Sequence, residues 1–271
     1  MRIAALVVCL LAFAAPASAA SGDAAFDAFV ASAWPPAQAA GVSRATFDRE
    51  TAGLTPDPAI KAQPARQGEF SLAIHSYLAQ VVTGARVAQG RAKAAGLSDT
   101  LAAIERRFGV PWEICVAIWG VETNFGPSQG GHDILRSIAT LAVRKHRADF
   151  YRDEFVAALA MLENGAPRDR LVGSWAGAMG QPQFTPSSYL KFAVSFSGGR
   201  QPDIWGSSAD ALASIANFLK QSGWNSSYPA LVEVVVPESF DWKPVDLDFS
   251  AWRRLGFARA DGEGSGLPVT V

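Results

Sequence analysis

Helical periodicity is the feature that most constrains how this chain can fold. Apolar residues recur at three- and four-residue intervals through most of the sequence, which is the spacing of one face of an α-helix. A β-branched run at 231–236 is the only segment that favours a strand. The pattern therefore predicts an α+β fold that is predominantly α-helical. The segments expected to be helical are 26–33, 69–95, 98–108, 111–122, 149–163, the stretch from Pro186 and the stretch from Ser208.

Local chemistry predicts where several of these helices begin and end. Gly96 interrupts the helical pattern, and Ser98 is placed to cap the next helix, which Gly109 ends. Pro111 then opens another helix in its first turn, where the missing N–H costs nothing. The segment 53–65 contains three prolines and is expected to be a loop.

Later helix ends carry equally specific signals. Thr185 followed by Pro186 is typical of an N-cap and first helical position, and Ser207-Ser208-Ala209-Asp210 is typical of a capped start to the next helix. Gly223 is expected to end that helix in the left-handed conformation, with Trp224 making the accompanying apolar contact.

The first residues indicate export. Arg2 precedes an apolar run from Ile3 to Ala15, and Ala17-Ser-Ala19 follows as a small-residue cleavage motif. A membrane anchor is the alternative, but it needs about 20 apolar residues. We therefore expect residues 1–19 to be a signal peptide cleaved after Ala19, with the functional domain in 20–271.

The charge and the scarce metal ligands exclude several functions. The chain has 24 Lys and Arg against 25 Asp and Glu, so no basic surface for nucleic acid is expected. The two cysteines and three histidines are not clustered, which predicts neither a zinc site nor a redox dithiol. The histidines are expected to be solvated or structurally bonded.

One segment combines an apolar helix with a carboxylate at its end. The helix from Pro111 finishes on Glu122, beside Trp119 and Phe125. Desolvation by these rings and the negative end of the helix dipole would favour the protonated carboxyl, as a general acid needs. A solvent-facing Glu is the alternative. Asn124 could bind a substrate amide, although a local turn is the commoner use.

A second segment, 173–189, is rich in glycine and amides. Three glycines fall within eight residues, with Trp175, Phe184 and two glutamines nearby. Small residues allow another group to approach the backbone, and amides beside an aromatic face suit a sugar. A glycine-rich connection packed between helices is the alternative.

Together these two segments resemble the B-type lytic murein transglycosylases. The likeness spans about 26–257 and rests on several motifs in fixed order. They are Gln67-Gly-Glu-Phe, Phe108-Gly-Val-Pro, Trp119-Gly-Val-Glu-Thr, the 173–189 block, Asp203-Ile-Trp-Gly and Ala216-Asn-Phe-Leu. The resemblance implies a lysozyme-like core at about 108–225, between a helical part at 24–107 and a C-terminal part at 226–271. It also implies a periplasmic, monomeric enzyme acting on peptidoglycan, with partners among cell-wall synthesis or division proteins.

The resemblance also assigns roles to individual residues. Glu122 would be the single catalytic acid and base. Ser174 would lie near the reacting sugar, Gln183 and Phe184 would hold the glycan, and Arg147 would contact a substrate carboxylate. Trp175 is the aromatic residue expected in the groove. A lysozyme-type hydrolase and a non-catalytic peptidoglycan-binding protein are the alternatives.

Three departures from the family pattern affect these expectations. The family often has an acidic calcium loop, but Ser195, Ser197 and Gly199 stand at its acidic positions, so no calcium or other cofactor is expected. Phe218 replaces a usual tyrosine, which removes one hydroxyl. The sequence also stops at Val271, short of a segment that finishes the groove in longer relatives.

Overall fold

The computed structural model describes residues 21–60, 74–144, 147–196, 198–227, 233–238, 254 and 256–259. The predicted α+β, predominantly helical class is confirmed. The helices are α1 (Ala24–Ser32), α2 (Trp34–Ala39), α3 (Arg44–Thr51), α4 (Ile74–Val81), α5 (Gly84–Gly96), α6 (Ser98–Phe108), α7 (Trp112–Thr123), α8 (Ile134–Val143), α9 (Ala148–Glu163), α10 (Pro186–Phe192) and α11 (Ser208–Gln221), with a 3-10 turn at Arg168–Arg170. The strands are β1 (His132–Asp133), β2 (Val172–Gly173), β3 (Val234–Val235) and β4 (Ala258–Arg259).

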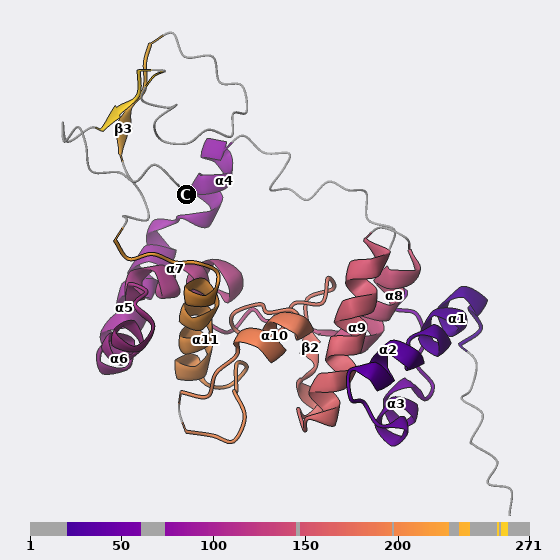
Figure 1. The fold of residues 1–271 in the computed structure, drawn as a ribbon. Coiled ribbons are helices and arrows are strands. Elements are labelled where there is room, and N and C mark those ends of the chain that lie inside the picture. Colours follow the sequence, from indigo (N-terminus) through magenta and orange to yellow (C-terminus); the bar gives the residue numbers. More distant parts are fainter. Residues whose placement is uncertain are drawn as a thin grey trace, which may run out of the picture.

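Two hydrophobic clusters divide these helices into two lobes. The first lobe comprises α1, α2, α3, α8 and α9, packed around residues such as Phe155 and Leu159. The second lobe comprises α5, α6, α7 and α11, packed around residues such as Ile104 and Trp119. The lobes lie at opposite ends of an elongated molecule (Figure 1).

Helix α10 lies between the lobes and joins them. It packs against α9 on one side and α11 on the other, which is visible in the middle of Figure 1. Its Tyr189 and Phe192 are buried in the first cluster, and the Tyr189 hydroxyl donates to the carbonyl of Pro202 at 3.0 Å. The segment 173–184 contacts both lobes, since Gly177 lies against Ile138 of the first and Gln181 is hydrogen-bonded to Trp119 of the second.

Two small antiparallel sheets complete the described structure. Strand β3 falls within the predicted strand 231–236, of which residues 231 and 232 lie outside the described residues, and it pairs with β4. The sequence did not indicate β1 and β2, which pair in the register His132 with Gly173 and Asp133 with Val172. Each has only two residues, too few for a strand pattern, so their pairing depends on tertiary contacts.

Several predicted helix boundaries were wrong. The single helix expected over 69–95 is two helices, because Thr83 caps α5 by accepting a hydrogen bond from the N–H of Arg86. Residues before 74 in that prediction lie outside the described part of the chain. Ser98 is the first residue of α6 and makes no cap, and Pro111 is the N-cap of α7 and not its first helical residue.

Other predicted ends are confirmed. Thr185 caps α10, with Pro186 at its first position, and Ser207 caps α11 through the N–H of Asp210. Gly223 has a φ of 97°, and the N–H of Trp224 donates to the carbonyl of Leu219 at 2.9 Å, which is the expected Schellman arrangement.

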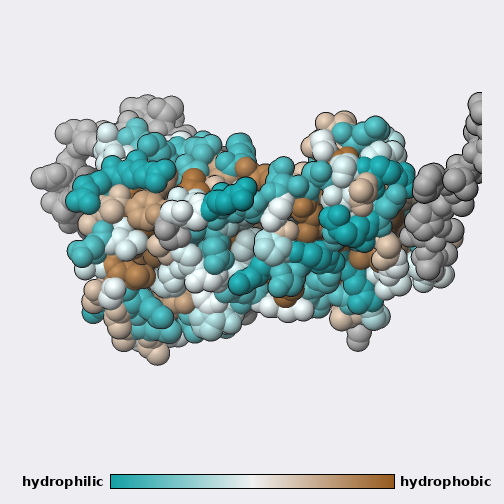
Figure 2. Space-filling view, turned by 90° about the horizontal axis from the view of Figure 1, so that it is seen from below, coloured by the Kyte–Doolittle hydropathy of each residue, from teal (hydrophilic) through white to brown (hydrophobic). Residues whose placement is uncertain are grey.

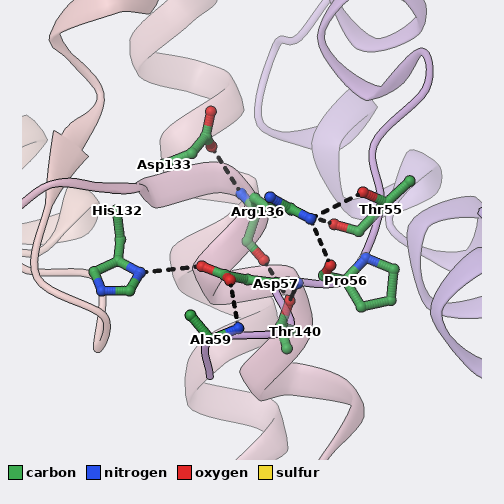
Figure 3. Close-up of polar contacts among 8 residues, drawn as sticks. All are labelled: Thr55, Pro56, Asp57, Ala59, His132, Asp133, Arg136 and Thr140. Atoms are coloured by element: carbon green, nitrogen blue, oxygen red, sulfur yellow. Dashed lines mark hydrogen bonds and ion pairs between the residues drawn. The ribbon is translucent and has the colours of Figure 1, made fainter. Parts of the chain in front are cut away.

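A polar network attaches the loop after α3 to α8 (Figure 3). The Arg136 guanidinium donates to the carbonyls of Thr55 and Pro56, and the Thr140 hydroxyl accepts from the N–H of Asp57. The Asp57 carboxylate lies 3.0 Å from the His132 ring, and this contact is the main cause that lowers the pKa of Asp57. His132 is thus structurally bonded, as predicted, and β1 is held in place beside β2.

The surface in Figure 2 is mostly hydrophilic. Hydrophobic residues on this face form small separate patches, and no continuous apolar band crosses it. Within the part of the chain that is described, no helix has both the length and the apolar character needed to cross a membrane.

Candidate active site

Glu122 lies in the last turn of α7, with its side chain exposed to solvent. The prediction that Trp119 and Phe125 desolvate it was wrong. Both rings are buried against each other, with centroids 5.5 Å apart, and the Phe125 ring occupies a slot beside Gly90 and Gly120. Because both rings pack into the second lobe, they do not bury Glu122, which is an exposed residue.

The end of α7 is shaped by a sharp change in backbone direction. Asn124 and Phe125 both have a positive φ, of 51° and 64°, and the N–H of Asn124 donates to the carbonyl of Gly120. Asparagine tolerates this left-handed conformation better than most residues. The structure therefore favours the local turn as the use of Asn124, and Gly126, with a φ of 109°, continues the turn as expected.

The glycines of the 173–184 segment make close contacts within the protein itself. A Cβ atom on Gly173 would lie 2.0 Å from the Ala178 carbonyl oxygen, one on Gly177 would lie 2.9 Å from Ile138, and one on Gly180 would lie 2.7 Å from Ile204. These three glycines thus allow the segment to pack tightly against the rest of the protein. This matches the alternative prediction of a glycine-rich connection packed between helices.

Ser174 and Trp175 lie in a turn that this packing creates. The Ser174 N–H donates to the carbonyl of Ala178 at 2.7 Å, and the Ser174 hydroxyl accepts from the Ala178 N–H at 3.0 Å. Both Ser174 and Trp175 are partly exposed. Their proposed contacts with a sugar stay predictions, but the turn holds them at the surface.

Gln183 and Phe184 lie at the C-terminal end of the 173–184 segment, just before α10. Gln183 has a positive φ of 52°, and its amide nitrogen donates to the carbonyl of Gly180 at 3.0 Å. Phe184 is only 7% exposed and packs on Phe218 of α11, with ring centroids 5.9 Å apart. Phe184 therefore contributes mainly to the core, and Phe218, at 36% exposed, presents more aromatic surface.

Arg147 precedes the first turn of α9 and is exposed. Its guanidinium lies over the ring of Phe150, 4.2 Å from the centroid, and its backbone has a φ of 56°. Arg147 lies next to α9 of the first lobe, whereas Glu122 lies on α7 of the second. Its role as a substrate contact stays a prediction.

Sequence reasoning placed both glutamines of the segment in a groove and missed the role of Gln181. This side chain is 4% exposed, accepts a hydrogen bond from Trp119 Nε1 at 2.8 Å and donates to the carbonyl of Trp205 at 3.0 Å. The backbone carbonyl of Gln181 accepts from the Thr123 hydroxyl at 2.9 Å. Gln181 therefore connects the end of α7 to the glycine-rich segment.

The stretch at the family's calcium loop has a donor set that does not fit calcium. Ser195 Oγ is buried without a hydrogen-bond partner, Gly199 has no side chain, and Ser197 lies outside the described residues. The Asp210 carboxylate instead accepts from the N–H groups of Phe196 and Asp203. No group of three or more His, Cys, Asp or Glu that could hold a metal occurs among the described residues.

Cys115 is unsuited to nucleophilic chemistry. It is a fully buried free thiol, and burial raises its pKa to about 12. The thiolate that would react is therefore scarce near neutral pH. Among the described residues, Glu122 and the polar groups of Ser174 and Gln183 stay the candidates for chemistry.

The fold agrees with the comparison to known families. The model described as Transglycosylase SLT domain matches residues 25–270. The chain belongs to this family, whose members of known structure have a lysozyme-like lytic transglycosylase fold.

One curated protein and two solved structures illustrate the similarity. The chain is 44% identical over 120 residues to membrane-bound lytic murein transglycosylase B of Escherichia coli, which covers 43% of this chain and 33% of that protein. SltB3 of Pseudomonas aeruginosa, solved with NAG-NAM-pentapeptide, has a TM-score of 0.78 and 36% identity over 91% of this chain and 67% of its own. The lytic transglycosylase Slt35 of Escherichia coli, solved with calcium, has a TM-score of 0.71 and 26% identity over 88% and 76%. The match to the curated relative thus spans about a third of that protein's length.

Proposed function

We propose that this chain is a periplasmic lytic transglycosylase that cleaves the β-1,4 bond between N-acetylmuramic acid and N-acetylglucosamine in peptidoglycan. Membership of the transglycosylase family supports this function. The likeness to SltB3, which was solved with a NAG-NAM-pentapeptide, supports the substrate class.

The position of Glu122 is the observation that carries the proposal. Glu122 is an exposed residue at the end of a partly buried helix, and two residues of the same turn, Trp119 and Thr123, are hydrogen-bonded to Gln181. The helix end is therefore anchored to the segment that presents Ser174 and Gln183. An acid whose helix end is attached to a segment with small and amide-bearing residues suits the cleavage of a sugar chain.

One carboxyl is enough for the proposed reaction. Glu122 first protonates the glycosidic oxygen as the C1–O bond breaks, and N-acetylglucosamine leaves as the alcohol. The resulting carboxylate then takes the proton from the 6-hydroxyl of the same N-acetylmuramic acid, whose oxygen bonds to C1. The product is a 1,6-anhydro ring, and Glu122 is again protonated. Because the nucleophile belongs to the substrate, no second carboxylate or water site is required.

Digestion of purified sacculi followed by mass analysis of the released muropeptides tests this proposal. We expect anhydro ends, which are lighter than hydrated ends by one water. Glu122→Gln should abolish product release, because an amide cannot donate the proton. Glu113→Gln is a matched control, since Glu113 is exposed at the opposite end of the same helix.

Other outcomes would indicate the alternatives. Hydrated ends would identify a lysozyme-type hydrolase, which uses water as the final acceptor. Binding to sacculi without any released fragment would identify a non-catalytic binding protein. Full activity of Glu122→Gln would remove Glu122 from the catalytic role.

A further inference from the structure

We propose that Gln181 is a positioning residue for the reaction: it holds the last turn of α7, and with it Glu122, against the segment that carries Ser174 and Gln183. This inference rests on the function proposed above. Gln181 itself is 4% exposed, so it acts through its neighbours and not by touching substrate.

Five hydrogen bonds define the environment of Gln181, and the longest of them runs from the Ser208 hydroxyl to the side-chain oxygen at 3.5 Å. Its side-chain oxygen accepts from the Trp119 indole N–H and its side-chain nitrogen donates to the Trp205 carbonyl. Its backbone carbonyl accepts from the Thr123 hydroxyl, and its N–H donates to the Ile204 carbonyl at 2.8 Å. The amide thus uses a donor and an acceptor at once, which an aliphatic side chain cannot do.

The partners of Gln181 belong to different lobes. Trp119 lies in the hydrophobic cluster of the second lobe, whereas Ile204 and Trp205 belong to the cluster of the first. Gln181 is therefore a polar connection between two apolar cores. Since all of these groups are buried, loss of the amide would leave the Trp119 donor unpaired inside the protein.

The two α7 residues held by Gln181 flank the catalytic carboxyl in sequence. Trp119 is three residues before Glu122, and Thr123 follows it directly, so the contacts restrain both the rotation and the tilt of this turn. The loop beyond also passes close by, because a Cβ on Gly126 would lie 3.0 Å from Gln181 Oε1. Proton transfer is sensitive to displacements of about 1 Å, which can cost about 100-fold in rate.

Steady-state kinetics on solubilised peptidoglycan strands test the inference. Rates are divided by the folded fraction of each variant, so that stability and positioning are measured separately. Gln181→Met, which keeps the approximate side-chain volume but has no amide, should lower kcat by about 10- to 100-fold while KM changes little. Gln221→Met is the control, because Gln221 is exposed on α11.

Two further variants probe the same contact. Trp119→Phe removes the indole donor, and its effect on kcat should not add to that of Gln181→Met, because both break one interaction. Gln181→Glu can replace the amide only when its carboxyl is protonated, since it then accepts from Trp119 and donates to Trp205. Its kcat should approach the wild-type value at low pH and fall as the pH rises through the pKa of the new carboxyl.

The outcomes separate this inference from the proposed function. Wild-type kcat per folded molecule in Gln181→Met would overturn the positioning role, even if anhydro products are formed. If Gln181→Met does not fold, a Gln181→Glu variant with the wild-type pH profile would overturn it instead. Hydrated products from the wild-type protein would contradict the proposed function, whereas a lowered kcat in Gln181→Met would still support the positioning role.

Discussion

The turn that presents Ser174 depends on Gly173, and replacing this glycine with alanine tests that dependence. The added Cβ would lie 2.0 Å from the Ala178 carbonyl oxygen and 2.8 Å from Ile134 Cδ1. Non-bonded carbon and oxygen atoms normally stay about 3.3 Å apart or more. The turn would therefore have to open by about 1 Å.

The cost can be estimated from the contacts that this movement breaks. Two hydrogen bonds join Ser174 to Ala178, one from the Ser174 N–H and one to the Ser174 hydroxyl. Each contributes about 1 kcal/mol, and overpacking adds about 1–3 kcal/mol. We expect Gly173→Ala to lower the free energy of unfolding by about 3–5 kcal/mol.

Urea unfolding followed by tryptophan fluorescence measures this change. Gly131→Ala is a matched control, because Gly131 lies just before β1, has no positive φ and has nothing within 4 Å of an added Cβ. The control should be neutral or stabilising by up to about 1 kcal/mol. A difference between the two variants below about 1 kcal/mol would refute the packing argument, because the turn would then accommodate a Cβ freely.

Two further predictions concern Asp57, in the loop after α3, and the response of the protein to calcium. Asp57→Asn should lower the free energy of unfolding near neutral pH, because the folded protein stabilises the Asp57 carboxylate and so lowers its pKa. The difference in this free energy between variant and wild type should vanish as the pH falls through the lowered pKa. Unfolding curves between pH 7 and acid check this, and a difference independent of pH would contradict it. Calcium added after EDTA treatment should leave the melting temperature unchanged, because Asp210 holds the N–H groups of Phe196 and Asp203 in place of a metal. A calcium-dependent rise in the melting temperature would show that the loop binds the ion.

Helix ends were predictable wherever the signal is local. Ser207 and Thr185 cap their helices because the side-chain oxygen reaches an N–H only three residues away. The break at Thr83 was missed because the apolar pattern continues across it. Ser98 was assigned as a cap, but the helix begins one residue earlier than that role requires. Periodicity identifies the helical face better than the residue where a helix stops.

Local patterns in the sequence were enough to predict the helical class, the family motifs and a carboxyl at the end of an apolar helix. How that carboxyl is surrounded depends on tertiary contacts. Phe125 turns into a slot between Gly90 and Gly120, so the rings next to Glu122 in sequence do not bury it. Gln181 and Gln183 are two residues apart, yet one is buried between the lobes and the other is partly exposed. Burial depends on which distant segments pack against a side chain, within the second lobe for Phe125 and between the two lobes for Gln181.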